Sequence, residues 1–458
     1  MENSEKLLII DEIEVEYQKL FNECKPKHEQ VKAGLDEGLN ILSNLKQSPL
    51  DEINDKLKES IEKLINPILL IAQNKVKRIY VTSLIVLQKI ISNSLINKDL
   101  SSSIIQSLGK ICEDSSEEFV HQKIVETLTP LIDINIMEIN QEIIEIIIKI
   151  ILKIFQVKGT SFKESLTLLI DKLLNIVCDN ITNELNPIIQ EKKENLINLE
   201  NQLQNEEKNN SLEKNININE ISNNIIIKKE EEIDTNNVND NDNNNIKEVK
   251  EEEKEEEKDK LKDNNYFTEP KFNLEGYEES EMFKSLFVLF KTACDLSEGK
   301  KFENIYVYKS VFTKCLGYEI LTSLISKTNS LFIYFPAIMV RINDSLHQEL
   351  LKRFGKAYDY FTCVKITKLS VKLMQNLQVG YDYIPFLIKY AENLNLNWQK
   401  QIGIEAFGEL VSNSIFLNDL FNKNFSLYEN LFNSLFKVSK DLIEHCKKKN
   451  TVMNLKKK

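Results

Sequence analysis

The clearest hydrophobic pattern in the chain lies between residues 51 and 96. Apolar side chains recur there at steps of three and four residues in two successive runs, 53–69 and 76–95. This spacing places one apolar stripe on each of two helices. Only Asn74 and its neighbours separate the runs, which predicts a helical hairpin. A lone pair cannot bury both stripes, so further helices must cover them.

Similar amphipathic patterns, separated by short turns, cover most of the remaining chain. They predict an all-α protein, an α-solenoid of HEAT- or armadillo-like helical hairpins, although no strict sequence period is present. Pro67 lies inside the first helix of the hairpin and predicts a kink or short break at Asn66. Phe335-Pro336 predicts a second kink. The other predicted helices span 5–24, 28–46, 103–112, 117–132, 140–157, 161–182, 282–296, 307–327, 331–354, 357–377, 383–394, 398–411 and 418–445.

A change of composition separates two helical blocks. Residues 198–265 are rich in Asn, Glu and Lys and contain no aromatic residue. Such a segment buries too little apolar surface to offset the entropy of ordering, which predicts a disordered linker. The predicted organisation is a helical domain over 5–190, a linker over 191–278, a second helical domain over 279–446, and a basic tail over 447–458.

Composition and charge narrow the functional classes. In a chain of 458 residues, 11 glycines and 8 prolines are few, which favours long helices over a sheet. A net charge of −12 disfavours general nucleic-acid binding, because phosphate contacts need an excess of Lys and Arg. The seven cysteines form no CxxC pair, which is typical of reduced thiols in the cytosol. The acidic N-terminus resembles no targeting signal, and charges interrupt every long apolar run, so we expect any membrane association to be peripheral.

No catalytic, metal-binding or phosphate-binding motif is recognisable. Cys24 and His28 have i,i+4 spacing, but Pro26 lies between them and no second pair is near. His445-Cys446 lies in a lysine-rich tail and is equally uninformative. Gly34 and Gly38 fall within a helical pattern, where close helix packing explains them better than phosphate binding. We therefore expect no cofactor, no metal and no enzymatic activity.

Two groups of basic residues are candidates for contact with an acidic partner or anionic lipid. A solvated helix end and a solubilising tail are the alternative interpretations, because most charge runs are surface features. The candidates are Lys75, Lys77 and Arg78 in the hairpin, and Lys447, Lys448 and Lys449 in the tail.

The hairpin also carries a family resemblance. The runs Lys25–Leu42 and Asn66–Ile96 resemble the N-terminal DCB (dimerisation and cyclophilin-binding) domain of the large Arf guanine-nucleotide exchange factors. The resemblance is greatest to the monensin-sensitivity-two (Mon-two) family, relatives that lack the catalytic domain. Runs in the second block, Leu316–Ile325, Ala357–Met374 and Asn397–Val411, resemble the HUS (homology upstream of the catalytic domain) domain of that family. Its Asn-Tyr-Asp-Cys box is not preserved at 360–363, which favours the non-catalytic branch.

The resemblance implies a non-catalytic scaffold for vesicle transport, peripheral on Golgi, trans-Golgi and endosome membranes. Implied partners are a second copy or a related DCB–HUS chain, an Arf-like small GTPase and a Dopey-type protein. This sequence has no room for the exchange domain after the HUS-like region, so we expect a short paralogue or a truncated gene model. Two alternatives remain open: a regulatory partner of a true exchange factor, and a HEAT-like adaptor unrelated to membranes.

Overall fold

Every regular element that the structure describes is a helix or a helical turn. The computed structural model describes the backbone of residues 2–49, 52–93, 98–133, 140–156, 163–229, 276–300, 311–328, 331–354, 359–393 and 396–456, together with residues 96 and 274. These residues contain no strand, and the all-α prediction is confirmed. None of their helices is long and apolar enough to cross a bilayer.

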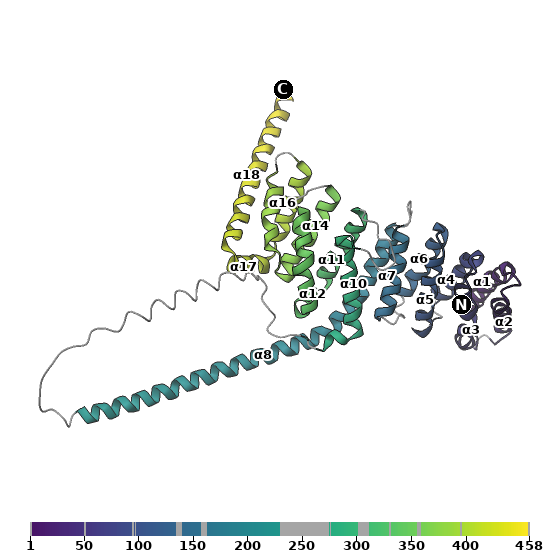
Figure 1. Ribbon diagram of the computed structural model, residues 1–458, viewed down its shortest axis with the longest axis horizontal. Coiled ribbons are helices and arrows are strands. Elements are labelled where there is room, and N and C mark those ends of the chain that lie inside the picture. The colour runs from purple at the N-terminus through teal and green to yellow at the C-terminus, as the bar shows by residue number, and fades with distance from the viewer. Residues whose placement is uncertain are drawn as a thin grey trace. The chain divides into compact units, whose positions relative to one another are not determined.

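The first helical block follows the predicted order of helices (Figure 1). A 3-10 turn over Lys77–Ile79 precedes α4, where the sequence predicted a helix from residue 76. The helices are α1 (Glu2–Glu23), α2 (Glu29–Lys46), α3 (Ile53–Gln73), α4 (Tyr80–Ser92), α5 (Lys98–Asp114), α6 (Glu118–Asp133), α7 (Gln141–Phe155) and α8 (Lys163–Lys229).

The second block contains shorter helices and more irregular turns. Two π-turns, Ile342–Leu346 and Leu373–Leu377, interrupt helices that the sequence pattern presented as continuous. The helices are α10 (Glu281–Glu298), α11 (Val311–Thr328), α12 (Pro336–Arg341), α13 (His347–Phe354), α14 (Tyr360–Lys372), α15 (Ile384–Ala391), α16 (Asn397–Val411), α17 (Ser414–Lys423) and α18 (Phe425–Lys456).

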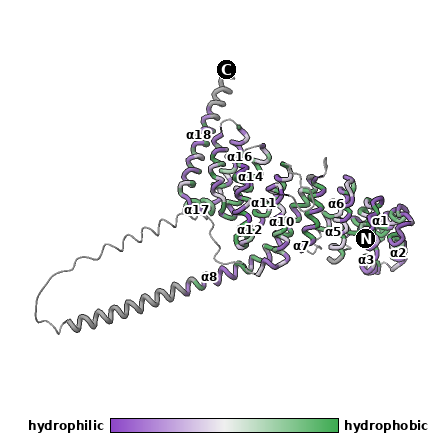
Figure 2. The backbone as a smooth tube through the Cα atoms, in the orientation of Figure 1, coloured by the Kyte–Doolittle hydropathy of each residue, from purple (hydrophilic) through white to green (hydrophobic). Residues whose placement is uncertain are grey.

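Successive helices pack in two rows, as a solenoid requires. One row contains α1, α4 and α6, and the other contains α3, α5, α7 and α10. The second block adds the row α11, α14 and α16. Hydrophobic positions recur along all of these helices (Figure 2). The helices in these rows therefore cover one another's apolar stripes, and the α-solenoid prediction is confirmed.

Helix α7 shows how local sequence produces this packing. The Asn140 side chain caps its first turn by accepting a hydrogen bond from the N–H of Ile143 at 3.0 Å. Isoleucines then recur at three- and four-residue steps, and Ile144, Ile147 and Ile154 are fully buried. Each such side chain stabilises the fold by about 1.5–3 kcal/mol relative to an exposed one. Burial on two sides makes α7 a central element of its row.

The two helical blocks belong to one compact unit, which comprises residues 1–182 and 269–458. Helix α7 packs directly on α10. The N–H of Gln141 lies 3.5 Å from the Glu281 carboxylate, and Lys327 donates a hydrogen bond to the Asn175 side chain. The apolar residues Leu173 and Leu316 help to line a small cavity at this junction. The stack therefore continues from the first block into the second.

Residues 183–229 belong to a second unit. Helix α8 extends to Lys229, so 191–229 of the predicted disordered linker is helical in the structure. Glu and Lys are good helix formers, and i,i+4 side-chain pairs such as Gln190–Glu194, at 2.9 Å, add local support. Most of the remaining predicted linker lies outside the described residues. The bounds of the four predicted segments remain predictions.

Pro67 does not break its helix, contrary to one of the two outcomes expected there. Helix α3 runs without interruption from Ile53 to Gln73, and Gly34 of α2 lies against the proline ring. A Cβ atom at Gly34 would lie 2.8 Å from Pro67 Cγ, and one at Gly38 would lie 2.5 Å from Tyr17 Cε1. Close helix packing thus explains both glycines, as predicted.

The predicted helix over 418–445 consists of two helices. Asn424 separates α17 from α18, and its side chain accepts a hydrogen bond from the N–H of Leu427 at 3.0 Å. An Asn side chain at this position caps a new helix. The periodicity of apolar residues continues through the boundary, which is why the pattern alone did not reveal it. At Phe335-Pro336, Pro336 instead begins α12 with Phe335 as its N-cap.

Candidate interaction site

The basic turn of the hairpin, Lys75, Lys77 and Arg78, is exposed at the connection between α3 and α4. Lys75 has a left-handed backbone conformation with φ of 51°. The N–H of Val76 bonds the Ile71 carbonyl at 3.1 Å, and the N–H of Lys75 bonds that of Ala72 at 3.3 Å. This is the pattern of a Schellman helix end, in which glycine usually holds the left-handed position. The turn is therefore shaped by the ending of α3.

Lys77 is held by the C-terminus of α5. Its ammonium group donates to the Asp114 backbone oxygen at 2.7 Å and lies 3.2 Å from the Asp114 carboxylate. Lys153 makes a similar bond, at 2.6 Å, to the backbone oxygen of Glu113. Cations are favourable at a helix C-terminus, where carbonyls lack internal partners and the helix dipole is negative. Lys77 therefore has a structural partner in addition to any role at a surface.

The Asp114 carboxylate accepts a hydrogen bond from the Tyr80 hydroxyl at 2.9 Å. Burial alone raises the pKa of this carboxyl, but the hydrogen bonds from Tyr80 and Lys77 outweigh burial and hold the pKa below its ordinary value. Asp114 is consequently ionised at neutral pH. Lys75, Lys110 and Glu113 line an open groove beside it. Charges of both signs line this groove, so it is not a purely basic lipid-binding patch.

The second basic group lies on a different element. Lys447 is exposed on α18, which also includes Lys448 and Lys449 in its backbone. The side chains of Lys448 and Lys449 lie outside the described residues. Helix α18 packs on α15, α16 and α17, whereas the basic turn packs on α1 and α4. The structure therefore gives the two groups separate surroundings, and lipid or partner contact at either remains a prediction.

The buried cysteines lack the surroundings of reactive thiols. Burial raises the pKa of Cys112, Cys178 and Cys294 to about 12 in each case. A thiol with such a pKa contains almost no nucleophilic thiolate at neutral pH. Within the described residues, no three His, Cys, Asp or Glu side chains are grouped so as to hold a metal ion.

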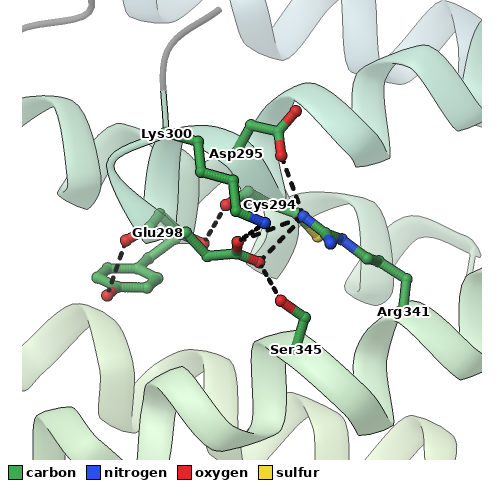
Figure 3. Close-up of polar contacts among 8 residues, drawn as sticks. Cys294, Asp295, Glu298, Lys300, Arg341 and Ser345 are labelled. Carbon is green, nitrogen blue, oxygen red and sulfur yellow. Dashed lines mark hydrogen bonds and ion pairs between the residues drawn. The ribbon is translucent and has the colours of Figure 1, made fainter.

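A polar cluster inside the second block was not anticipated from the sequence (Figure 3). The Arg341 guanidinium lies 3.0 Å from Asp295 and 3.1 Å from Glu298. Ser345 donates to Glu298 at 2.7 Å, and Lys300 also forms an ion pair with Glu298. Burial raises the pKa of Asp295, although Arg341 opposes the shift. The cluster joins the C-terminus of α10 to α12 and the following π-turn, so its role is to connect helices.

An exposed apolar surface on α18 was also missed. We call it the aromatic stripe; it consists of Phe425, Tyr428, Phe432, Phe436 and Ile443. The Tyr428 and Phe432 ring centroids lie 4.7 Å apart. The spacing of three, four, four and seven residues was available in the sequence as a second apolar face on one helix. A surface of this kind is suited to binding another protein rather than to catalysis.

Comparison with known proteins identifies the first block. Residues 3–185 match the family model described as DCB: Mon2/Sec7/BIG1-like, dimerisation and cyclophilin-binding domain. No curated protein matches the chain, and no solved structure matches it. The predicted DCB resemblance is thus confirmed, while the HUS resemblance of the second block remains a prediction. The first helical block of the chain, α1 to the start of α8, is therefore similar to the dimerisation and cyclophilin-binding domain of Mon2/Sec7/BIG1-like proteins.

Proposed function

We propose that the chain is a non-catalytic scaffold for vesicle-mediated transport between Golgi and endosome membranes. The observation that supports this most strongly is the match of residues 3–185 to the DCB domain. The packing of α7 on α10 joins the second helical block to the DCB domain and so extends the helical surface on which partners can bind. A second copy, a related DCB–HUS chain, an Arf-like GTPase and a Dopey-type protein are the partners that the resemblance implies.

Self-association through the DCB domain is the part of this proposal that purified protein can test. Leu8 and Val15 are 58% and 55% exposed and lie seven residues apart on α1, which places them on one helix face. Exposed apolar pairs of this kind are suited to helix–helix contact. The proposal therefore places the contact between two DCB domains on the outer face of α1.

The experiment compares the wild-type full chain with the double variant Leu8→Asp, Val15→Asp. Sedimentation of the purified protein measures its mass, and a fluorescent fusion in cells reports its overlap with Golgi and endosome markers. We expect the variant to sediment with a lower mass than wild type, because it no longer associates through α1. We also expect its fluorescent fusion to lose its punctate localisation. Val340→Asp is the control, because Val340 is equally exposed but lies outside the DCB domain.

The outcomes separate the alternatives. A wild-type fusion that stays diffuse, with no overlap with either marker, would contradict the transport role. Co-purification with an exchange factor, together with an altered nucleotide-release rate, would favour a regulatory partner of that enzyme. Association without membrane localisation would leave a helical adaptor of another pathway.

A further inference from the structure

Helix α18 presents two apolar faces, of which the described helices cover one. Leu431 and Val438 are buried on the inner face against α15, α16 and α17. Lys437 fixes this orientation by an ion pair with Glu392 at 2.5 Å. The aromatic stripe lies on the outer face, where Phe436 is 71% exposed and Phe425 is 56% exposed.

The stripe is straight and ordered. At 3.6 residues per turn, Phe425, Phe436 and Ile443 lie within roughly 20° of one another around the helix axis. The Phe425 ring stacks on Tyr428 with centroids 6.2 Å apart, and Phe421 of α17 lies 5.2 Å from Tyr428. These ring contacts support the aromatic side chains against one another, which lowers the entropic cost of binding.

The apolar area on this face is large enough for a weak but specific interface. Aromatic side chains bury about 150–250 Å² each, so the exposed parts of the stripe and of Phe421 add up to roughly 500 Å². Pairing two such faces removes roughly 1,000 Å² from water, which reaches the lower limit for a specific protein interface. Two copies of this surface are therefore sufficient for a dimer.

The stripe is also complementary to itself in an antiparallel arrangement. If a twofold axis passes between Phe432 and Phe436, Phe432 faces Phe436 of the second copy. The same axis places Phe425 opposite Ile443 of the second copy. Phe425, Phe432, Phe436 and Ile443 then each meet an apolar residue, as an isologous interface requires, whereas the half-buried Tyr428 lies opposite Lys440 of the second copy.

Charges beside the stripe follow the same symmetry. Glu429 and Lys440 are both exposed and lie on the same flank of the stripe. In an antiparallel pair, residues on one flank face the equivalent flank of the partner, so Glu429 lies beside Lys440 of the second copy. Two opposite-charge pairs form, related by the twofold axis. A parallel pair would instead place this flank of the two copies on opposite sides of the interface, so Glu429 and Lys440 would not meet.

We propose that the aromatic stripe of α18 is a homodimer interface, in which two copies pack antiparallel about the Phe432–Phe436 midpoint with Glu429 and Lys440 paired across it. The surface lies outside residues 3–185, so it is separate from the DCB domain and independent of the proposed function. An anionic membrane is a poorer occupant, because Glu429, Asp441 and Glu444 are all exposed along this helix.

The test reverses the charges of Glu429 and Lys440, singly and together, in the full-length protein. Glu429→Lys alone and Lys440→Glu alone each place like charges together, and we expect the dimer to weaken roughly tenfold in low salt. An equimolar mixture of the two variants restores both opposite-charge pairs in a mixed dimer, as does the double variant. Sedimentation equilibrium measures all four samples. Glu405→Lys and Lys368→Glu on α16 and α14 are the charge-matched controls, and we expect them to associate as wild type does.

A second variant tests the apolar contact. Phe436→Ser removes the most exposed ring of the stripe without disturbing the inner face, and we expect roughly a hundredfold weaker dimer. Single charge variants that associate like wild type, or a mixture that fails to recover, would overturn the proposal. Loss of flotation with phosphatidylserine vesicles, with an unchanged mass, would assign the stripe to a membrane instead. Association through α1 would persist in every α18 variant, so the two proposals fail separately.

Discussion

Arg341 and Glu298 lie 3.1 Å apart although 43 residues separate them in the chain. The pair joins α12 to the C-terminal end of α10, and Asp295 completes it from the same side. Glu298 is only 8% exposed. A carboxylate in such surroundings depends on its cation, because the energy of removing it from water is recovered only through pairing.

We expect Arg341→Met to lower the free energy of unfolding by about 2–3 kcal/mol, since it leaves two partly buried carboxylates without their shared cation. Urea unfolding followed by circular dichroism measures the change. The double variant Arg341→Met, Glu298→Gln removes one of those charges and should recover part of the loss. A single variant within 0.5 kcal/mol of wild type, on the scale of ordinary surface substitutions, would contradict a connecting role for the cluster.

Replacing each of two glycines of α16 by alanine should change the stability of the protein in opposite directions. A Cβ atom at Gly403 would lie 2.3 Å from the backbone nitrogen of Ala391, whereas one at Gly408 would meet nothing within 4 Å. Gly403→Ala therefore forces α15 and α16 apart and should destabilise the protein by about 1–3 kcal/mol. Gly408→Ala should stabilise it by about 0.5–1 kcal/mol through helix propensity. Thermal unfolding measures both variants, and each serves as the control for the other. Equal shifts in their melting temperatures would show that the α15–α16 contact is looser than described.

His121 makes part of the stability depend on pH. The imidazole is fully buried, and its Nε2 lies 3.0 Å from the Ser115 carbonyl oxygen. Burial lowers the pKa of His121, so the unfolded chain binds a proton more readily than the folded one as pH falls below the ordinary value of 6.5. The neutral imidazole therefore makes its full contribution to the free energy of unfolding above pH 6.5, and this contribution declines as the pH falls below that value.

The measurement compares wild type with His121→Gln at pH 7.5 and 5.5. We expect the free energy of unfolding of wild type to fall more on acidification than that of the variant, since only wild type contains this titrating group. Identical pH dependence in the two proteins would show that His121 is not buried in its neutral form.

Lys75 offers a test that separates backbone strain from charge. Lys75→Gly and Lys75→Ala remove the same charge, but only glycine adopts φ of 51° without steric cost. We expect the glycine variant to be more stable than the alanine variant by about 1 kcal/mol. Vesicle sedimentation of both variants shows whether the charge contributes to lipid contact. Equal stability of the two would mean that α3 does not end in a left-handed residue.

Sequence periodicity was sufficient to predict the helices and their packing as a solenoid, because an apolar stripe on a helix requires a neighbouring helix to cover it. It located α7 within two residues, since Asn140 and the isoleucines after it are both local signals. It did not reveal that α7 packs on α10, because the contact between Gln141 and Glu281 spans 140 residues. The boundary at Asn424 was missed for a different reason, as apolar residues continue through it at helical spacing.

The candidate basic residues illustrate the same limit. Lys75, Lys77 and Arg78 are contiguous, so the sequence identified them as a group. Their separate roles depend on the end of α3 and on the C-terminus of α5, which approach only in the folded chain. The Arg341 cluster and the aromatic stripe depend likewise on which helix faces are covered.

The α7–α10 junction has a consequence for the covalent continuity of the chain. Residues 1–182 and 269–458 form one compact unit, although 86 residues of sequence, 183–268, lie between them. Leu185 and Ile189 at its start are buried, so we expect the fold to tolerate a break only in the part of the connection that follows them. Cleavage within it should leave two polypeptides that remain associated, and the same two fragments, produced separately, should reassemble as a split protein.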